Sequence, residues 1–266
     1  MQRWQAGGWS ITRVPDPGFS LVLPQDEATR AALQRAGWLR PRFVTDEWAL
    51  RVGSSALVLS DGGTTAIVDP WLAFDDPSRF RPRLDALAAA GWVPDEIDLV
   101  INSHIDGVGA NVDPETGAAA FPKARYLVPG AEMEDLAGGQ HQGAEGLLAL
   151  ERAGALDRYD DRVEPVPGIV LDALPGHNRG HFGVYVGDPP AAVIAGHLFL
   201  HPAQIANPDA ADLDRDPVTV RATRRALLER CERDGLLLVG PLFEDPGGGT
   251  IARHDGRWQL EAESAG

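Results

Sequence analysis

An apolar strand that runs directly into a polar loop is the most constraining feature of this 266-residue chain. Residues 99–101, Leu-Val-Ile, predict a buried strand, and the loop behind it carries His104 and Asp106 before a glycine-rich exit. Such a strand fixes the position of its end, while the loop leaves one side open to a substrate. Imidazole and carboxylate groups are ligands that zinc accepts, so this stretch predicts a metal-binding loop.

Composition and charge narrow the class of protein. The 44% of hydrophobic residues and the seven Trp are enough for a substantial core. The net charge of −15 disfavours binding to nucleic acid or to an anionic membrane surface. No apolar run approaches the roughly 18 residues that span a bilayer, and the N-terminus lacks the apolar core of a secretory signal. We therefore expect a cytoplasmic protein that acts on a small molecule, without nucleic-acid or membrane partners.

Strand and helix patterns alternate along the chain. Residues 55–60 and 64–69 flank Asp-Gly-Gly at 61–63, which predicts a hairpin. Residues 1–44 are expected to form an N-terminal arm packed on a main domain of residues 45–266, an arrangement compatible with a homodimer. The single cysteine, Cys231, excludes an intramolecular disulfide and is expected to be a core thiol. Helices are expected at 79–90, 131–136, 143–153 and 217–233, and further strands at 124–128, 182–186, 192–195, 236–239, 250–253 and 258–260.

Several motifs in order resemble those of the metallo-β-lactamase-fold hydrolases, whose signature is Thr-His-x-His-x-Asp-His-x-Gly after an apolar strand. Residues 175–181, Pro-Gly-His-Asn-Arg-Gly-His, resemble the Pro-Gly-His-Thr-Pro-Gly-His loop of that family, and residues 66–69 resemble its early strand ending in Asp. Residues 201–204 and 249–253 are similar to the branch that contains lactonases and methyl parathion hydrolases. The resemblance implies an α/β fold, an αββα sandwich of two mixed sheets flanked by helices.

The resemblance also implies that this chain has fewer metal ligands than the family. His104 and His181 match two ligand positions of the first metal. If two residues are missing between His104 and Asp106, Asp106 aligns with the motif Asp and Gly107 with the last His of the motif. Without that gap, Asp106 stands in the place of the second His. The bridging Asp of the family is replaced by His197, and its C-terminal His by Leu242.

These replacements limit the number of metal ions. Two divalent ions a few ångströms apart repel each other, and a bridging carboxylate offsets that repulsion. The neutral imidazole at residue 197 does not supply this anion, and a leucine at residue 242 has no lone pair. We therefore expect at most one ion, zinc or iron, with a metal-free pocket of hydrogen-bonded histidines as the alternative. The predicted ligand set is His104, Asp106, His181 and His197.

The predicted function is hydrolysis of a small ester, lactone or related acyl substrate at a single-metal site. Asp106 and His197 are also candidate catalytic residues, as a general base and as a hydrogen-bonded base in the volume of the missing second metal. The resemblance implies that His177 either supports a metal ligand from behind or packs within its loop. One alternative is a metal-free member that uses Asp106 with His197 or His181 in a cyclisation or elimination of a biosynthetic pathway. Another is a non-catalytic protein that keeps the fold and binds a ligand.

Overall fold

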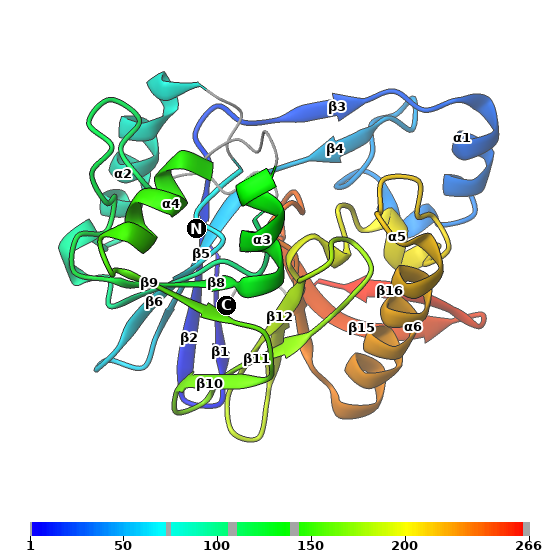
Figure 1. Ribbon diagram of the computed structural model, residues 1–266. Coiled ribbons are helices and arrows are strands. Elements are labelled where there is room, and N and C mark those ends of the chain that lie inside the picture. Colours follow the sequence, from blue (N-terminus) through cyan, green and yellow to red (C-terminus); the bar gives the residue numbers. More distant parts are fainter. Residues whose placement is uncertain (1, 73–75, 106–110, 139–143, 263–266) are drawn as a thin grey trace.

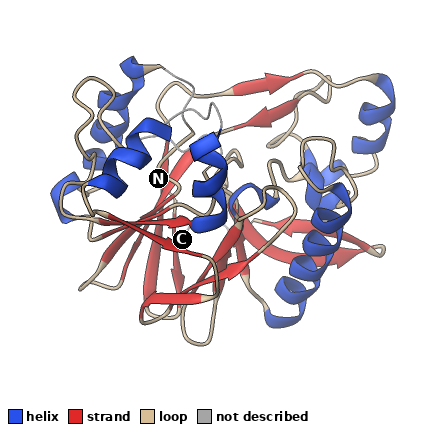
Figure 2. Ribbon diagram, viewed as in Figure 1, coloured by secondary structure: helices blue, strands red, loops and turns tan. Residues whose placement is uncertain are grey.

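Two large β-sheets face each other, and helices cover their outer sides (Figure 1). The computed structural model describes residues 2–72, 76–105, 111–138 and 144–262. In this part of the chain, the strands form two seven-stranded sheets and a two-stranded ribbon. Figure 2 shows the sheets in the middle of the molecule and the helices outside them. This αββα arrangement confirms the predicted fold class.

The first sheet has the order β1-β2-β5-β6-β7-β8-β9. The pairings from β1 to β6 are antiparallel, and those from β6 to β9 are parallel. The predicted hairpin is confirmed by β5 and β6, which pair antiparallel. The strands are β1 (Arg3–Ala6), β2 (Trp9–Pro15), β5 (Ser55–Ser60), β6 (Thr65–Val68), β7 (Leu99–Ile101), β8 (Arg125–Pro129) and β9 (Leu156–Tyr159).

The second sheet has the order β10-β11-β12-β13-β14-β15-β16, in which β13 and β14 are parallel and all other pairs are antiparallel. A separate ribbon pairs β3 (Leu21–Leu23) with β4 (Leu50–Val52). The strands of the second sheet are β10 (Val163–Val166), β11 (Ile169–Ala173), β12 (Phe182–Val186), β13 (Ala192–Ile194), β14 (Leu237–Val239), β15 (Gly248–His254) and β16 (Arg257–Glu261).

Helices α2, α3 and α4 cover the first sheet, and α1, α5 and α6 cover the second. None of the helices in the described ranges is both long and apolar enough to cross a membrane. The helices are α1 (Glu27–Leu33), α2 (Phe80–Ala89), α3 (Gly130–Gly138), α4 (Ala144–Arg152), α5 (Ala203–Ala206) and α6 (Pro217–Asp234), with single 3-10 turns at η1 (Gly37–Leu39), η2 (Pro77–Arg79), η3 (Pro94–Glu96) and η4 (Gly196–Leu198).

The central strand β7 is apolar on both faces because one face packs against the other sheet and the other face packs against helices. In β7, Leu99 and Ile101 belong to the core between the sheets, whereas Val100 packs under the helices of the first sheet. Successive side chains of a strand point to opposite faces, so a strand covered on both sides needs a continuous apolar run. That is why the run at residues 99–101 predicted a buried strand correctly.

Helix α6 begins and ends with the signals that its sequence contains. The Asp216 side chain accepts hydrogen bonds from the backbone N–H groups of Val218 and Thr219, and Pro217 occupies the first turn. Gly235 ends the helix with a φ of 67°, a left-handed conformation that favours glycine. The predicted helix at 217–233 is therefore confirmed. Cys231 is buried in its packed face, as expected for a core thiol, and burial raises the pKa of the thiol to about 12.

The N-terminal segment contributes more to the sheets than its sequence pattern predicted. Arg3–Ala6 and Trp9–Pro15 form an antiparallel hairpin, and β2 pairs with β5 inside the first sheet. Trp4 and Trp9 are buried in the core between the sheets. The predicted domain boundary after residue 44 stays a prediction.

Loops from both sheets meet at one edge of the sandwich. The strands β6 and β7 are parallel, with Val68 opposite Ile101, so the residues that follow them lie together. In the second sheet, β12 begins beside the end of β13, where Val184 pairs with Ile194. The backbone N–H of Phe182 donates to the carbonyl oxygen of Ser103 at 2.9 Å and joins the two sheets at this edge.

Candidate metal centre

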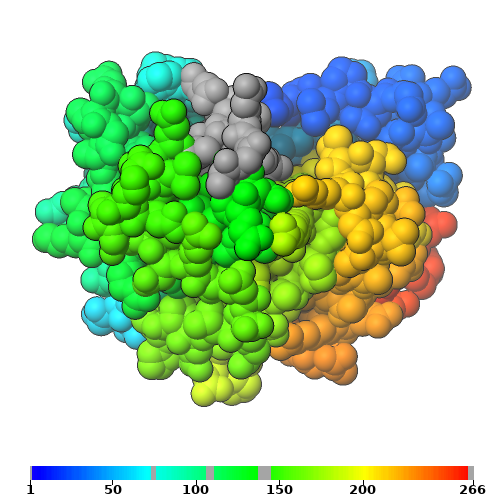
Figure 3. Space-filling model, in the orientation of Figure 1, coloured from blue at the N-terminus to red at the C-terminus, as the bar shows by residue number. Residues whose placement is uncertain are grey.

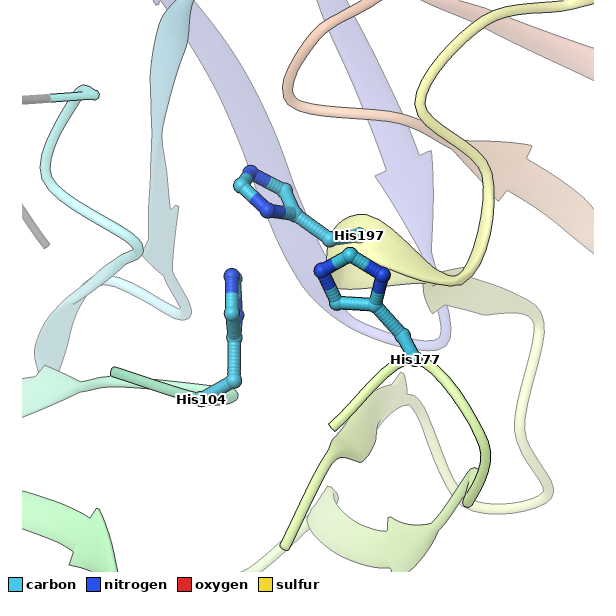
Figure 4. A group of neighbouring side chains, drawn as sticks. All are labelled: His104, His177 and His197. Carbon is cyan, nitrogen blue, oxygen red and sulfur yellow. The ribbon is translucent and has the colours of Figure 1, made fainter. Parts of the chain in front are cut away.

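Three buried histidines converge at this edge (Figure 4). One ring nitrogen from each of His104, His177 and His197 lies within 4.8 Å of those of the other two. The ring centroids of His104 and His197 are 4.1 Å apart, and those of His177 and His197 are 5.4 Å apart. The three residues are between 1% and 7% exposed. In Figure 4 the three rings come from separate segments of the chain and face a common space.

A carboxylate and a hydroxyl group orient the His104 ring. The Ser103 hydroxyl donates to Asp69 Oδ2 at 2.7 Å, and the Ser103 backbone N–H donates to Asp69 Oδ1 at 2.8 Å. Because the hydroxyl hydrogen is directed to Asp69, Ser103 Oγ accepts the Nδ1–H of His104 at 2.9 Å. The His104 lone pair is therefore on Nε2, on the side of the ring away from Ser103.

Asp69 directly follows β6, and its backbone has a φ of 44°. Burial raises the pKa of Asp69 to about 6, the two hydrogen bonds from Ser103 oppose this rise, and the charge of Glu132 adds to it. Asp69 is therefore ionised at pH 7, as its role as a double acceptor requires.

His177 is oriented in the same way by a second carboxylate. Its Nδ1 lies 2.9 Å from Asp214 Oδ1, and the Asp214 side chain is fully buried. Because a carboxylate accepts, Nδ1 carries the hydrogen and Nε2 the lone pair. Metal-binding histidines commonly donate their other ring N–H to a carboxylate or a carbonyl in this manner. The sequence resemblance had placed His177 behind the ligands or in the packing of its loop, and not among the ligands.

His181 is buried beside the cluster, and protein groups contact both of its ring nitrogens. The backbone N–H of His197 donates to His181 Nε2 at 3.0 Å, so His181 Nδ1–H donates to the carbonyl oxygen of Leu174 at 3.1 Å. Burial, followed by the charges of His177 and His197, holds the pKa of His181 well below its ordinary value. In this geometry His181 supports the turn that carries His197, and its predicted role as a ligand stays a prediction.

The other residues of the predicted ligand set divide into two groups. His104 and His197 lie together, and their predicted role as metal ligands stays a prediction. Asp106 lies outside the described residues. The site therefore contains two predicted ligands, with His177 as the third member of the cluster.

A buried glutamate that the sequence reasoning missed connects two of the loops. Glu132, in the first turn of α3, accepts the backbone N–H of Ile105 on Oε2 at 3.0 Å and that of Gly180 on Oε1 at 3.1 Å. The residue is 2% exposed. A glutamate in a first helical turn is commonly a surface residue that favours the helix dipole, so its sequence position gave no signal of this role.

Gly196 permits the close approach of the loops. It has a φ of 52°, and a Cβ atom there would lie 2.5 Å from Ser103 Oγ and 2.6 Å from His181 Nε2. Any other side chain would push the turn η4 away from these two residues. A glycine at residue 196 is therefore a structural requirement of this site.

A cavity of about 570 Å³ lies between the N-terminal segment and the second sheet. Figure 3 shows the blue N-terminal segment above the yellow segment near residue 200. Leu200, in the cavity wall, follows His197 by three residues, a chain length of about 11 Å at most. Leu242 also lines this cavity, and it follows β14, the parallel neighbour of the strand that precedes His197. The apolar part of the wall includes Leu33, Ala36, Leu50, Val52, Leu200 and Leu242.

Comparison with solved structures identifies the fold of the chain. No protein-family model matches the chain, and no curated protein matches it either. Among solved structures, AidC, a dizinc quorum-quenching lactonase, superposes with a TM-score of 0.78 at 14% identity over 99% of this chain and 97% of that chain. The hydrolase AbOPH of the β-lactamase superfamily superposes with a TM-score of 0.76 at 19% identity, over 97% of this chain and 96% of that chain. A probable metal-dependent hydrolase from Staphylococcus aureus has a TM-score of 0.73 at 16% identity, over 98% of this chain and 100% of that chain.

The chain therefore has the metallo-β-lactamase fold, as the sequence resemblance predicted. The histidine cluster also fits a metal ion by the chemistry of its donors. Two of its rings present Nε2 lone pairs because their Nδ1–H groups are bonded to Ser103 and Asp214. Three imidazole nitrogens with one coordination position left open are a known ligand set of catalytic zinc.

Proposed function

We propose that this protein is a metal-dependent hydrolase that binds one divalent ion, zinc in the first instance, through His104, His177 and His197. The observation that supports this best is the convergence of three buried imidazoles, two of which have a buried hydrogen-bond acceptor behind them. Asp106, outside the described residues, is retained as a further ligand or as a general base.

The same residues argue for one ion instead of two. His197 stands where the resemblance implies a bridging carboxylate, and its ring faces the cluster. Leu242 stands where it implies a histidine, and this side chain is 5% exposed in a largely apolar wall. A second divalent ion would lack both the anion that offsets its repulsion and a nitrogen ligand.

The residues of the chain would hold the ion in a site with little access to solvent. When bound by His104, His177 and His197, a zinc ion would supply Lewis acidity toward a carbonyl group and toward water. Ser103 and Asp214 fix two of the rings, so these ligands need no reorientation. The low exposure of the cluster strengthens electrostatic interactions at the site.

The cavity supports a substrate with an apolar group. The AidC structure contains the product N-hexanoyl-L-homoserine. In the present chain, a cavity of about 570 Å³ with many leucine and alanine side chains begins within a few residues of His197. We propose a small ester or lactone whose acyl chain lies in this cavity, since apolar contact with its wall contributes about 0.8 kcal/mol per buried methylene.

Metal content and activity test the proposal together. We expect about one equivalent of zinc by ICP-MS in protein purified without chelators, and hydrolysis of esters or lactones that is lost with the metal. His104→Ala and His177→Ala should lose both, whereas the exposed His254→Ala should keep both. Less than about a tenth of an equivalent, with no gain in metal or activity on reconstitution, would contradict the proposal.

One observation favours a second candidate. Asp214 paired with His177 is also the arrangement of a carboxylate with an imidazole general base, which works without a metal. The second candidate is acid–base chemistry, such as a cyclisation or elimination in a biosynthetic pathway. Turnover that survives complete removal of metal and disappears in His177→Ala would favour it over metal-dependent hydrolysis.

A further inference from the structure

Arg224 of helix α6, on the right of Figure 1, has a fully buried side chain that bonds to the turn η4 and, at two points, to the loop between α5 and α6. Its Nε donates to the carbonyl oxygen of Leu198 at 2.6 Å, and its Nη1 donates to that of Ala210 at 2.6 Å. Its Nη2 donates to Asp214 Oδ2 at 2.8 Å. A guanidinium group is planar and its donors have fixed directions, so these three acceptors are held at fixed separations.

Two of these three acceptors adjoin the histidine cluster. Leu198 is the residue after His197, in the same turn η4. Asp214 uses its second oxygen, Oδ1, to accept the Nδ1–H of His177. One guanidinium group therefore connects the turn that carries His197 to the carboxylate that orients His177.

Both side-chain oxygens of Asp214 accept hydrogen bonds, and this determines which ring nitrogen of His177 carries the hydrogen. Arg224 has donors only, so the Asp214 oxygen that faces it must accept. The other oxygen is also an acceptor, since the carboxylate is paired with a guanidinium. His177 must then carry its hydrogen on Nδ1, which leaves the Nε2 lone pair on the opposite side of the ring.

We propose that Arg224 and Asp214 are positioning residues that lock His177 in the Nδ1–H tautomer and set its separation from His197, and thereby set the affinity of the cluster for a divalent ion. The statement about affinity rests on the proposed metal site, whereas the statement about the tautomer stands without any metal.

An asparagine at residue 214 makes this proposal specific. Asparagine has one acceptor oxygen, and Arg224 requires that oxygen because it has no acceptor of its own. The NH2 group then faces His177 Nδ1, which must accept, and the hydrogen moves to Nε2. Asp214→Asn therefore inverts the tautomer and blocks the ligand nitrogen, whereas Asp214→Ala only removes the partner. A merely structural role of Asp214 predicts the opposite order, with alanine more damaging than asparagine.

The chain contains a matched control for a buried Arg–Asp pair. Arg83 and Asp16 are 5% and 4% exposed. Arg83 Nη2 donates to Asp16 Oδ2 at 2.9 Å and to the carbonyl oxygen of Leu72 at 2.6 Å. No described histidine is bonded to this pair. Asp16→Asn and Arg83→Lys thus disturb a similar ion pair without touching the cluster.

The first measurement is a long-range 1H–15N NMR spectrum of the metal-free protein, with the His177 signals assigned by His177→Gln. We expect the Nδ1–H pattern for wild-type His177 and the Nε2–H pattern in Asp214→Asn. Any other tautomer in the wild type overturns the proposal, and this arm does not require the Asp214 variants to fold. A wild-type pattern in Asp214→Asn overturns it as well.

The second measurement is a Co²⁺ titration followed by visible absorption. We expect Asp214→Asn to weaken binding about 100-fold and Asp214→Ala about 10-fold, the range that loss of a ligand's supporting carboxylate produces. Arg224→Lys should change the absorption bands, and Asp16→Asn and Arg83→Lys should stay within about twofold of wild type. The proposal is overturned if the control variants at Asp16 and Arg83 lose as much Co²⁺ affinity as the variants at Asp214 and Arg224. It is also overturned if Asp214→Ala binds Co²⁺ more weakly than Asp214→Asn does. If the wild type binds no Co²⁺, the proposed metal site fails, and the tautomer result alone decides this inference.

Discussion

The backbone N–H of His197 donates a hydrogen bond to Nε2 of His181 at 3.0 Å. This bond uses the lone pair with which His181 would bind an ion, because its other nitrogen donates to Leu174. His177 lies four residues earlier in the same loop and meets His104 and His197 instead. The loop from residue 175 to 181 therefore contains two histidines, and their hydrogen bonds support the proposal that His177 is a ligand and His181 a supporting residue.

The first prediction separates these two histidines. His177→Ala removes a ring of the cluster and should weaken Zn²⁺ binding more than 100-fold, whereas His181→Gln should weaken it less than about tenfold, because it disturbs only the supporting hydrogen bonds. Competition with a chromophoric chelator measures both affinities. The reverse order would mean that His181 turns into the cluster when the ion binds.

The second prediction concerns the turn that carries His197. Gly196→Ala combines a positive φ with contacts of 2.5 and 2.6 Å, so we expect a loss of about 2–4 kcal/mol in the free energy of unfolding, together with weaker metal binding. Gly235→Ala is the control, since it has a φ of 67° with nothing within 4 Å of its Cβ, and it should cost about 1–2 kcal/mol. Urea titration gives both free energies of unfolding. Equal losses in the two variants would show that close contacts at residue 196 do not contribute to the effect.

The third prediction concerns the group that connects Asp69 to His104. Ser103→Ala removes the acceptor of the His104 Nδ1–H and should weaken Zn²⁺ binding about tenfold. Ser55→Ala is a suitable control, because the buried Ser55 hydroxyl has no hydrogen-bond partner among the described residues. Isothermal titration calorimetry compares the two variants. An unchanged affinity in Ser103→Ala would show that the His104 ring is held by its packing alone.

The fourth prediction is a dependence of stability on pH through His201. Burial lowers the pKa of His201 to about 4, whereas its hydrogen bond to the carbonyl oxygen of Phe43 opposes this shift. The unfolded chain therefore binds a proton more readily, so the contribution is complete above about pH 6.5 and is lost as the pH falls toward 4. A shift of this size corresponds to about 2–3 kcal/mol at pH 4.5.

Urea unfolding at pH 7 and pH 4.5 measures this contribution. His201→Gln should lose less stability on acidification than the wild type by about that amount, because glutamine does not titrate. The exposed His254→Gln should follow the wild-type profile. Parallel profiles for all three proteins would exclude His201 as a source of acid sensitivity.

Several strands and helices were predictable because their signals are local and periodic, whereas the αββα arrangement was implied by the motif resemblance. The hairpin at β5 and β6, the strand β12 and the capped helix α6 agree with their predicted ranges to within one or two residues. The strands β1 and β2 were missed because Arg3–Ala6 is short and alternates polar with apolar residues. Its role is set by pairing with β2 and by burial of Trp4, which are long-range effects.

The site was predictable in its loops but not in its individual contacts. Motif order singled out His104, after β7, and His197, after β13, and the structure brings these two residues together. Which histidine of residues 175–181 faces the cluster depends on Asp214, 37 residues further along the chain. Glu132, Asp214 and Arg224 are charged, and a charged residue in a helix or loop is usually on the surface. Only the three-dimensional arrangement shows that they are buried and hydrogen-bonded.

The central claim is that one ion is held by three imidazoles, and anomalous diffraction at the zinc absorption edge tests it most directly. We expect a single peak, with nitrogen atoms of His104, His177 and His197 at about 2.0–2.1 Å from it. Two peaks, or a peak bonded to His181 in place of His177, or no peak after crystals are grown with zinc, would contradict the account.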